Sequence, residues 1–303
     1  MTLLAVGSMA IDSVKTPFGE RQESIGGSAT YFSVSASFFT KVSLVAVIGD
    51  DFPSTELEFL KSRDVDLSGV EKTEGKTFRW KGEYHEDMNV AHTLDTQLNV
   101  FENFKPEIPR TLKNIDYLFL ANIDPDLQIS VLEQIDSPKL VACDTMNFWI
   151  EGKNDSLMKI VSLIDILIIN DAELCSLAED KNLLTAAKKI RDLGPSTLVV
   201  KRGEFGAILF HKEEIFAVPA FPVKNVIDPT GAGDTFAGGF MGFLTLKGMS
   251  SNNLRNAVIY GSVMASFNVQ SLSFDRLRSL EKAEISERYQ EFSRLLHYDK
   301  VQV

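Results

Sequence analysis

Short apolar segments alternate with segments of helical periodicity along most of this chain of 303 residues. The segments predicted to be buried strands are 3–6, 41–48, 117–121, 140–143, 166–169, 197–200 and 207–210. The predicted helices are 28–39, 126–135, 155–163, 172–178, 183–193, 235–246, 253–268 and 283–296. This alternation is typical of an α/β fold with a mostly parallel sheet covered by helices on both faces. Such sheets bind ligands beyond the carboxyl ends of their strands, so we expect functional residues there.

Two segments, 12–24 and 76–101, interrupt the alternation. The second contains residues spaced by two, as on one face of a strand, namely Phe78, Trp80, Gly82 and Tyr84. We expect the two segments to form a small β-structure, a lid, that projects from a single domain spanning residues 1–303. Because its parts come from distant positions, it is expected to cover a site. A plain surface hairpin is the alternative.

The charge balance limits the class of partner. The chain has 31 basic and 42 acidic residues and a net charge of −11. Nucleic acids and anionic membranes are bound by basic surfaces, so neither is expected as a partner. The sequence contains no apolar stretch approaching the ~18 residues of a membrane span and no pattern typical of a signal peptide. We therefore expect a cytoplasmic protein whose ligands are small molecules.

The most informative motif is residues 228–234, DPTGAGD, which directly precedes an apolar helix. Glycine at positions 231 and 233 allows a sharp turn and a close approach to a ligand. The backbone amides of Gly231, Ala232 and Gly233 would lie at the helix N-terminus, where amides and the helix dipole bind anions. Phosphoryl transfer needs such a site, because negative charge spreads over the oxygens of the transferred group.

Asp234 lies at the same helix start, where its carboxylate is favoured in the ionised form and can accept a proton from a hydroxyl. The alternative is that Asp234 only caps the helix and that the glycines only form a turn. The chain has no P-loop motif, and the segment Gly231–Gly233 lacks the third glycine of the dinucleotide-binding fingerprint.

Residues 228–239, DPTGAGDTFAGG, resemble the C-terminal signature of the PfkB (ribokinase-like) kinase family. Further matches follow the family's order along nearly the whole chain. Residues 7–12 resemble the opening strand with its substrate-binding aspartate, and Gly26-Gly27 resembles the family's diglycine. Residues 170–173 resemble the Asn-x-x-Glu element, and 201–206 resemble the nucleotide-side turn.

The resemblance implies a ribokinase-like fold with a β-lid, ATP and Mg²⁺ as cofactors, and phosphoryl transfer to a primary hydroxyl. It implies that Asp234 is the general base and that the amides of Gly231, Ala232 and Gly233 form the anion hole. By the same resemblance, the residues on the acceptor side are Asp12, Gly26, Gly27 and Ser28. Those on the nucleotide side are Asn170, Lys201, Gly203, Gly206 and Thr230.

Two metal roles are also implied by the resemblance. Glu173 would organise Mg²⁺ through water, and Asp228 would help to bind a monovalent cation, K⁺. Each has a simpler alternative. Asn170 and Glu173 have the spacing of a helix capping box, and Asp228 could be a turn residue before Pro229.

The segment after the diglycine departs from the family. Many members have an asparagine there that faces the sugar, whereas this chain reads SATYF at 28–32. Ser28 or Thr30 is a possible substitute. Bases stack on aromatic faces, and both the lid and residues Tyr31 and Phe32 supply such faces.

These features favour a nucleoside such as adenosine or inosine as acceptor. A sugar such as ribose or fructose is the alternative. A non-catalytic ligand-binding protein is a further alternative, but its base or loop should be disrupted, and here both are intact. For the assembly we expect a monomer or a homodimer.

Overall fold

The computed structural model describes residues 2–297, so both ends of the predicted domain 1–303 extend beyond the described residues. Its main sheet has the strand order β13-β12-β11-β10-β9-β8-β1-β4-β5. The strands are β1 (Leu3–Val6), β4 (Val42–Ile48), β5 (Val65–Lys72), β8 (Tyr117–Leu120), β9 (Leu140–Asp144), β10 (Ile166–Asn170), β11 (Thr197–Lys201), β12 (Ala207–His211) and β13 (Glu214–Val218). The pairs β11–β12 and β12–β13 are antiparallel, and the other described pairs of this sheet are parallel.

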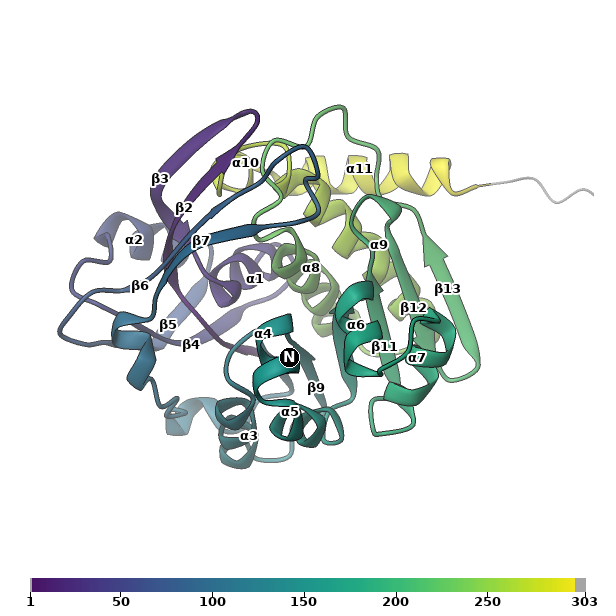
Figure 1. The fold of residues 1–303 in the computed structure, drawn as a ribbon, viewed down its shortest axis with the longest axis horizontal. Coiled ribbons are helices and arrows are strands. Elements are labelled where there is room, and N and C mark those ends of the chain that lie inside the picture. Colours follow the sequence, from purple (N-terminus) through teal and green to yellow (C-terminus); the bar gives the residue numbers. More distant parts are fainter. Residues whose placement is uncertain (1, 298–303) are drawn as a thin grey trace, which may run out of the picture.

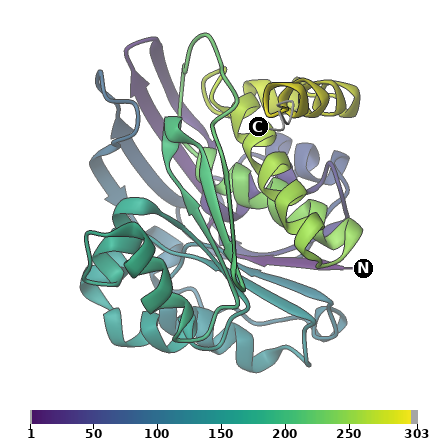
Figure 2. The same ribbon diagram turned by 90° about the vertical axis from the view of Figure 1, so that its right-hand side faces the viewer.

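Helices cover both faces of this sheet (Figures 1 and 2). One face packs against α1 (Ser28–Ala36), α2 (Ser54–Ser62), α8 (Ala232–Lys247), α9 (Ser251–Asn268), α10 (Asp275–Ser279) and α11 (Lys282–Leu295). The other packs against α3 (Pro125–Gln134), α4 (Asn147–Gly152), α5 (Asn154–Val161), α6 (Asp171–Leu177) and α7 (Leu183–Arg191). In β1, Leu3 and Ala5 join the first core whereas Leu4 and Val6 join the second. Burial on both faces explains why this strand is apolar throughout.

A second, four-stranded sheet stands apart from the main sheet (Figure 1). Its order is β3-β2-β6-β7, with β2 at Ala10–Thr16, β3 at Gly19–Gly26, β6 at Phe78–Glu83 and β7 at His92–Gln97. We call it the lid sheet. The two segments predicted to form a small β-structure pair here, because β2 and β6 run side by side in parallel. Short 3₁₀ helices complete the described elements at η1 (Asn99–Asn103), η2 (Arg110–Leu112) and η3 (Gly203–Phe205).

The predicted strands and helices are confirmed within a few residues at their ends, and α8 begins at Ala232 rather than at 235. The helices α2, α4 and α10 and the edge strands β5 and β13 were not predicted. Among residues 2–297, no helix is both long and apolar enough to cross a membrane.

Candidate active site

Two predicted site residues, Asn170 and Lys201, lie where neighbouring strands end, together with Asp144, which was not predicted. Asp144 ends β9, Asn170 ends β10 and Lys201 ends β11, and these three strands are neighbours in the sheet. Lys201 Nζ lies 3.3 Å from Asp144 Oδ2. The carboxylates of Asp144, Glu173 and Asp234 are close enough to Lys201 to affect its pKa. The start of α8 therefore faces the strand ends, as expected for a doubly covered parallel sheet.

The 228–234 loop is held in place by hydrogen bonds from several directions. Asp228 is fully buried, and its two carboxylate oxygens accept the amides of Thr230 at 2.9 Å and Ser273 at 2.8 Å. The Thr230 carbonyl accepts the Asn268 side chain at 2.8 Å. Gly231 adopts φ +71°, and a Cβ at this position would collide with the ring of Tyr31. This glycine is therefore required by both backbone conformation and space.

The amides of the loop are not equivalent. The Ala232 amide donates to the Pro229 carbonyl at 3.1 Å, so it is engaged in the turn itself. Within residues 2–297, the amides of Gly231 and Gly233 have no hydrogen-bond acceptor. Both residues remain partly exposed at the N-terminus of the 16-residue helix α8. Of the three predicted anion-hole amides, these two are therefore free to donate to a ligand.

Asp234 lies in the first turn of α8. The expectation that the helix start favours its ionised form is wrong, because burial raises its pKa from 3.8 to about 7, and the negative charge of Asp144 adds to the rise while Lys201 opposes it. A carboxylate with a pKa near neutrality is a stronger proton acceptor than an ordinary aspartate and is still ionised above that pH. The position and basicity of Asp234 suit a general base.

Asp12 lies on β2 of the lid sheet and is 5% exposed. Burial raises its pKa to about 7 against the hydrogen bond from the Gly27 amide, and the charges of Asp228 and Asp234 add to the rise. A Cβ at Gly26 would collide with the Asp12 carboxylate, so the diglycine gives this side chain its place. Asp12 and Asp234 thus belong to one electrostatically coupled site although 222 positions of sequence separate them.

The side chains after the diglycine do not face a ligand as predicted. Tyr31 is 2% exposed and stacks on Phe274 with ring centroids 3.9 Å apart, beneath Gly231. Phe32 is fully buried and stacks on Phe119. Their prediction as base-stacking residues is therefore wrong, because α1 turns both rings into the core.

The two hydroxyls of this segment, Ser28 and Thr30, are also buried. The Ser28 hydroxyl lies 3.1 Å from the hydroxyl of Ser8, and the residue is 8% exposed. Thr30 is fully buried and its Oγ1 has no hydrogen-bond partner among the described residues. Thr30 therefore cannot replace the asparagine that the family places toward the sugar, whereas Ser28 keeps a position beside Gly27.

Asn170 and Glu173 form a complete capping box at the start of α6. Asn170 Oδ1 accepts the Glu173 amide at 2.7 Å, and Glu173 Oε2 accepts the Asn170 amide at 3.0 Å. Burial raises the pKa of Glu173 to about 7, with Lys201 opposing and Asp144 adding to the rise. The simpler alternative considered for this pair is thus present, and its hydrogen bond to the Asn170 amide uses one of the two carboxylate oxygens of Glu173.

The donor set also fits Mg²⁺. No group of three or more His, Cys, Asp or Glu side chains among residues 2–297 could hold a metal unaided. Magnesium in kinase sites keeps several waters and is bound by one or two carboxylates together with substrate phosphates. A single carboxylate beside Lys201, such as that of Glu173, matches that mode of binding.

The predicted nucleotide-side turn follows β11. Gly203 and Gly206 have φ +52° and +89°, and the Arg202 amide donates to the Gly206 carbonyl at 2.8 Å. A Cβ at Gly203 would collide with Oδ1 of Asn89, which lies between β6 and β7. The loop of the lid sheet therefore reaches the turn predicted to bind the nucleotide.

The lid sheet has distinct inner and outer faces. Asp12 pairs with Trp80 and Val14 pairs with Gly82, so these side chains share the inner face. A Cβ at Gly82 would collide with the Trp80 ring, which therefore lies over this glycine. Tyr84, predicted to belong to the same row, lies beyond the end of β6 and reaches the 228–234 loop instead.

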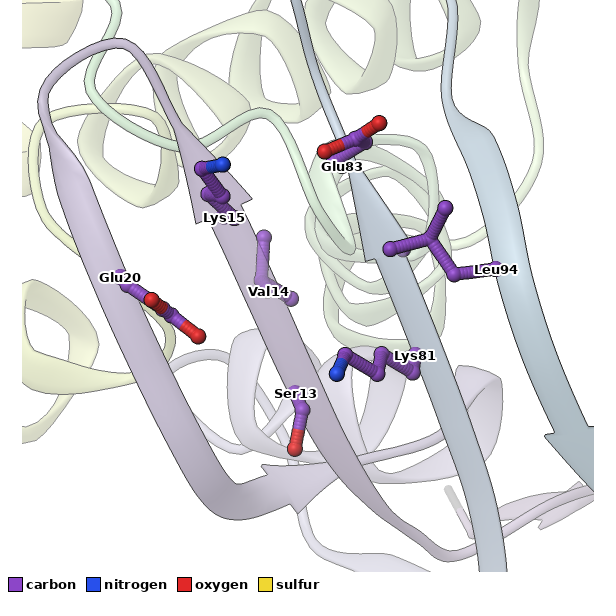
Figure 3. Close-up of a pocket in the computed structure, with 8 residues that line it drawn as sticks. Ser13, Val14, Lys15, Glu20, Lys81, Glu83 and Leu94 are labelled. Carbon is purple, nitrogen blue, oxygen red and sulfur yellow. The ribbon is translucent and has the colours of Figure 1, made fainter.

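A hollow of about 220 Å³ lies on the lid sheet (Figure 3). Its lining residues are Ser13, Val14, Lys15, Glu20, Lys81, Gly82, Glu83 and Leu94. Ser13 pairs with Lys81 and Lys15 with Glu83, which places these side chains on the face opposite Asp12 and Trp80. Its lining includes none of Asp12, Trp80 and the 228–234 loop.

Comparison with known proteins agrees with this geometry. The model of the pfkB family of carbohydrate kinases matches residues 3–276. The chain belongs to this family. It is a kinase, and it transfers a phosphoryl group to an alcohol acceptor.

Named relatives of this pfkB kinase include enzymes that act on nucleosides. A cytidine kinase of Thermococcus kodakarensis is 31% identical over 246 residues, which cover 80% of this chain and 87% of the relative. A nucleoside kinase of Methanocaldococcus jannaschii is 23% identical over 75% of this chain and 73% of its own.

Solved structures share the ribokinase-like fold of this pfkB kinase. The M. jannaschii nucleoside kinase structure has a TM-score of 0.76 at 20% identity and covers 96% of this chain and 98% of its own. A putative ribokinase II of E. coli, solved with ATP and Mg²⁺, has a TM-score of 0.78 at 17% identity and covers 96% of this chain and 99% of its own.

Proposed function

We propose that this kinase transfers the γ-phosphoryl group of ATP to the primary hydroxyl of a nucleoside. The observation that carries the proposal is the pairing of Asp12 with Trp80 on the inner face of the lid sheet. A carboxylate that can accept ribose hydroxyls thereby adjoins an aromatic ring on which a base can stack. Asp12 is also close enough to Asp234 for their charges to interact.

In the proposed reaction, Asp234 accepts the proton of the acceptor hydroxyl. The freed oxygen forms a bond to the γ-phosphorus, and the bond from that phosphorus to the β–γ bridging oxygen breaks to release ADP. The amides of Gly231 and Gly233 donate to the oxygens of the transferred group, where charge develops. Burial of Asp234 supports this assignment because it raises the basicity of the carboxylate.

The nucleotide side is proposed at the ends of β10 and β11. Gly203 and Gly206 provide a turn with left-handed backbone that lets a ligand approach the main chain. Mg²⁺ neutralises phosphate charge when bound, and Glu173 would orient its water ligands while Asn170 holds that carboxylate in place. We also assign Thr230, from the 228–234 loop, to the residues that contact the nucleotide.

For Asp228 we propose a brace for the loop, because both its oxygens accept backbone amides. Each of these oxygens keeps a lone pair, so ligation of K⁺ is compatible with the brace. Replacing KCl by NaCl or tetramethylammonium chloride at constant ionic strength separates the two roles. A fall in kcat on removal of K⁺ would show that Asp228 also serves a cation site. An unchanged kcat would leave the bracing of the loop as its only role.

A substrate panel tests the acceptor class. Sequence features favour adenosine and inosine, and the similarity to a cytidine kinase adds cytidine. Guanosine, ribose and fructose complete the panel, with kcat/KM measured at saturating ATP and Mg²⁺. We expect a nucleoside to have the highest value. A higher value for ribose or fructose than for every nucleoside would replace the proposal with a sugar kinase.

A variant pair links this preference to the lid sheet. Base–aromatic stacking contributes ~1–3 kcal/mol, so Trp80→Ala should lower kcat/KM for the preferred nucleoside roughly 5- to 150-fold and change that for ribose little. Asp12→Ala should lower both. Lys81→Ala, on the outer face of the same strand, is the matched control and should behave as wild type. Equal losses for nucleoside and ribose in Trp80→Ala would contradict base stacking.

A further inference from the structure

An ion pair with little exposure joins two strand ends beside the 228–234 loop. Lys201 ends β11 and Asp144 ends β9, with β10 between them. Their side chains are 18% and 5% exposed, and the distance from Nζ to Oδ2 is 3.3 Å. Because desolvation offsets most of the attraction in a buried pair, such a pair contributes little to stability. Stability alone therefore does not explain its place in the site.

The ammonium group of Lys201 is directed at the loop. A Cβ built on Gly233 would lie 3.0 Å from Lys201 Nζ. The charge is therefore adjacent to one of the two amides that are free to bind an anion. Lysine has three N–H donors, and the contact with Asp144 uses one of them. The other donors are available to a phosphoryl oxygen held at Gly233.

We propose that Lys201 is a catalytic cation that binds the transferred phosphoryl group beside Gly233, and that Asp144 is the positioning residue that holds its ammonium there. The inference rests on the proposed phosphoryl transfer to an alcohol. Charge moves onto the oxygens of the transferred group and the leaving phosphate in the transition state, and a fixed cation in a poorly solvated site stabilises that charge without reorganisation.

The charges around Lys201 support this role. Burial opposes its charged form, but Asp144, Glu173 and Asp234 outweigh this effect and raise the pKa of Lys201. The lysine therefore stays protonated throughout the range in which the enzyme would act. The charges of these three carboxylates act on the ammonium group of Lys201, which supplies positive charge for phosphate within an otherwise acidic cluster.

Lys201 and Asp144 also shift the pKa of Asp234, the proposed base, in opposite directions. The groups that face Asp234 are Asp144 from β9, Glu173 from α6, Lys201 from β11, and Asp12 and Tyr84 from the lid side. Among them, Asp144 raises the pKa of Asp234 and Lys201 lowers it. Removing Lys201 should move the acidic limb of the kcat profile to higher pH, and removing the charge of Asp144 should move it to lower pH. Both shifts report the charges of the pair, whereas a loss of kcat on the plateau of the profile reports binding of the transferred group.

The test compares Lys201→Met, Lys201→Arg and Asp144→Asn with the best acceptor of the panel. Loss of one preorganised donor to a developing oxyanion costs ~10²–10³-fold in rate, so Lys201→Met should lose that much kcat. Lys201→Arg should retain more activity, because it keeps the charge. Asp144→Asn should lose less than Lys201→Met and show the opposite shift of the acidic limb.

The double variant Lys201→Met with Asp144→Asn keeps the test decisive if a single variant folds poorly. It removes both charges of the pair together, so it should be destabilised less than a variant that leaves one of them unpaired, yet kcat should stay as low as in Lys201→Met. A double variant with wild-type kcat, or a single Lys201→Met variant that keeps over about a third of it on the plateau of its own pH profile, would overturn the inference. The proposed function itself would fail separately, if wild-type protein phosphorylated no acceptor of the panel.

Discussion

The phenol oxygen of Tyr84 lies 3.4 Å from Oγ1 of Thr230 and joins the lid sheet to the loop that carries Asp234. Tyr84 is 9% exposed, and its amide also donates to the Lys15 carbonyl on β2. Burial raises the pKa of Tyr84 to about 12, so the phenol remains neutral, and its oxygen accepts the hydroxyl of Thr230. The Tyr84 side chain thus couples the position of the lid sheet to the loop.

Tyr84→Phe should weaken this coupling while the ring keeps its packing. A neutral hydrogen bond contributes ~0.5–1.5 kcal/mol, so kcat/KM for the acceptor should fall roughly 2- to 12-fold, with the melting temperature nearly unchanged. The KM for ATP serves as the internal control and should change less than that for the acceptor. Wild-type kcat/KM in this variant would show that the contact is incidental.

Two neighbouring glycines should respond differently to alanine. At Gly231 the positive φ and the Tyr31 ring both oppose a side chain, so Gly231→Ala should lower the melting temperature as well as kcat. At Gly233 only the flexible end of Lys201 is close, at 3.0 Å from the new Cβ. Gly233→Ala should therefore fold normally and lose turnover. Normal turnover in Gly233→Ala would contradict the anion-binding role of this part of the loop.

Glu173→Gln separates metal binding from helix capping. Glutamine at this position can still accept the Asn170 amide, so the capping box and the melting temperature should be kept. The carboxylate charge is lost, so the Mg²⁺ concentration for half-maximal rate should rise severalfold. Wild type and variant are each titrated with Mg²⁺ at the same fixed ATP concentration. An unchanged Mg²⁺ titration would leave Glu173 with the capping role alone.

The sequence was sufficient for the parts of the fold that depend on local pattern. Continuous apolar runs marked β1 and β8–β11 because both faces of these strands are buried. The pattern failed for β5, whose residues are largely exposed or half-buried along Val65–Lys72, because it lies at the edge of the sheet. The edge strand β13 was missed for the same reason.

Within the site, the sequence predicted residues that belong to a contiguous motif and missed contacts made across the sheet. Asp234 and Gly231 were found because the loop 228–234 carries its own signal. The pairing of Asp144 with Lys201 depends on strand order, and 57 positions separate the two. The sequence signal that could have linked Asp144 with Lys201 is that each directly follows an apolar strand segment. Tyr31 was misplaced because its helix, α1, is buried on all sides, and only packing shows where each ring points.

Ionisation of Asp234 should favour activity and disfavour the folded state, so its contribution to stability should fall as the pH rises. The folded-state pKa of Asp234 is raised from 3.8 to about 7, so the folded protein holds the proton more tightly than the unfolded chain. The resulting destabilisation is complete above pH 7 and is relieved as the pH falls toward 4. Without nucleotide and with EDTA, Asp234→Asn should melt at a higher temperature than wild type at pH 8, and the difference should shrink toward pH 4. A lower melting temperature at pH 8 would indicate that Asp234 is a stabilising helix cap.

The central claim is that Asp234 is the general base, and its most direct test is kcat of Asp234→Asn at pH 8. The assay uses saturating ATP and Mg²⁺ and the acceptor with the highest wild-type kcat/KM. Loss of a general base costs ~10²–10⁴-fold, so kcat should fall by at least that range's lower limit while the acceptor KM changes less than about threefold. A variant that keeps more than about a third of the wild-type kcat would contradict the assignment of Asp234 as the base.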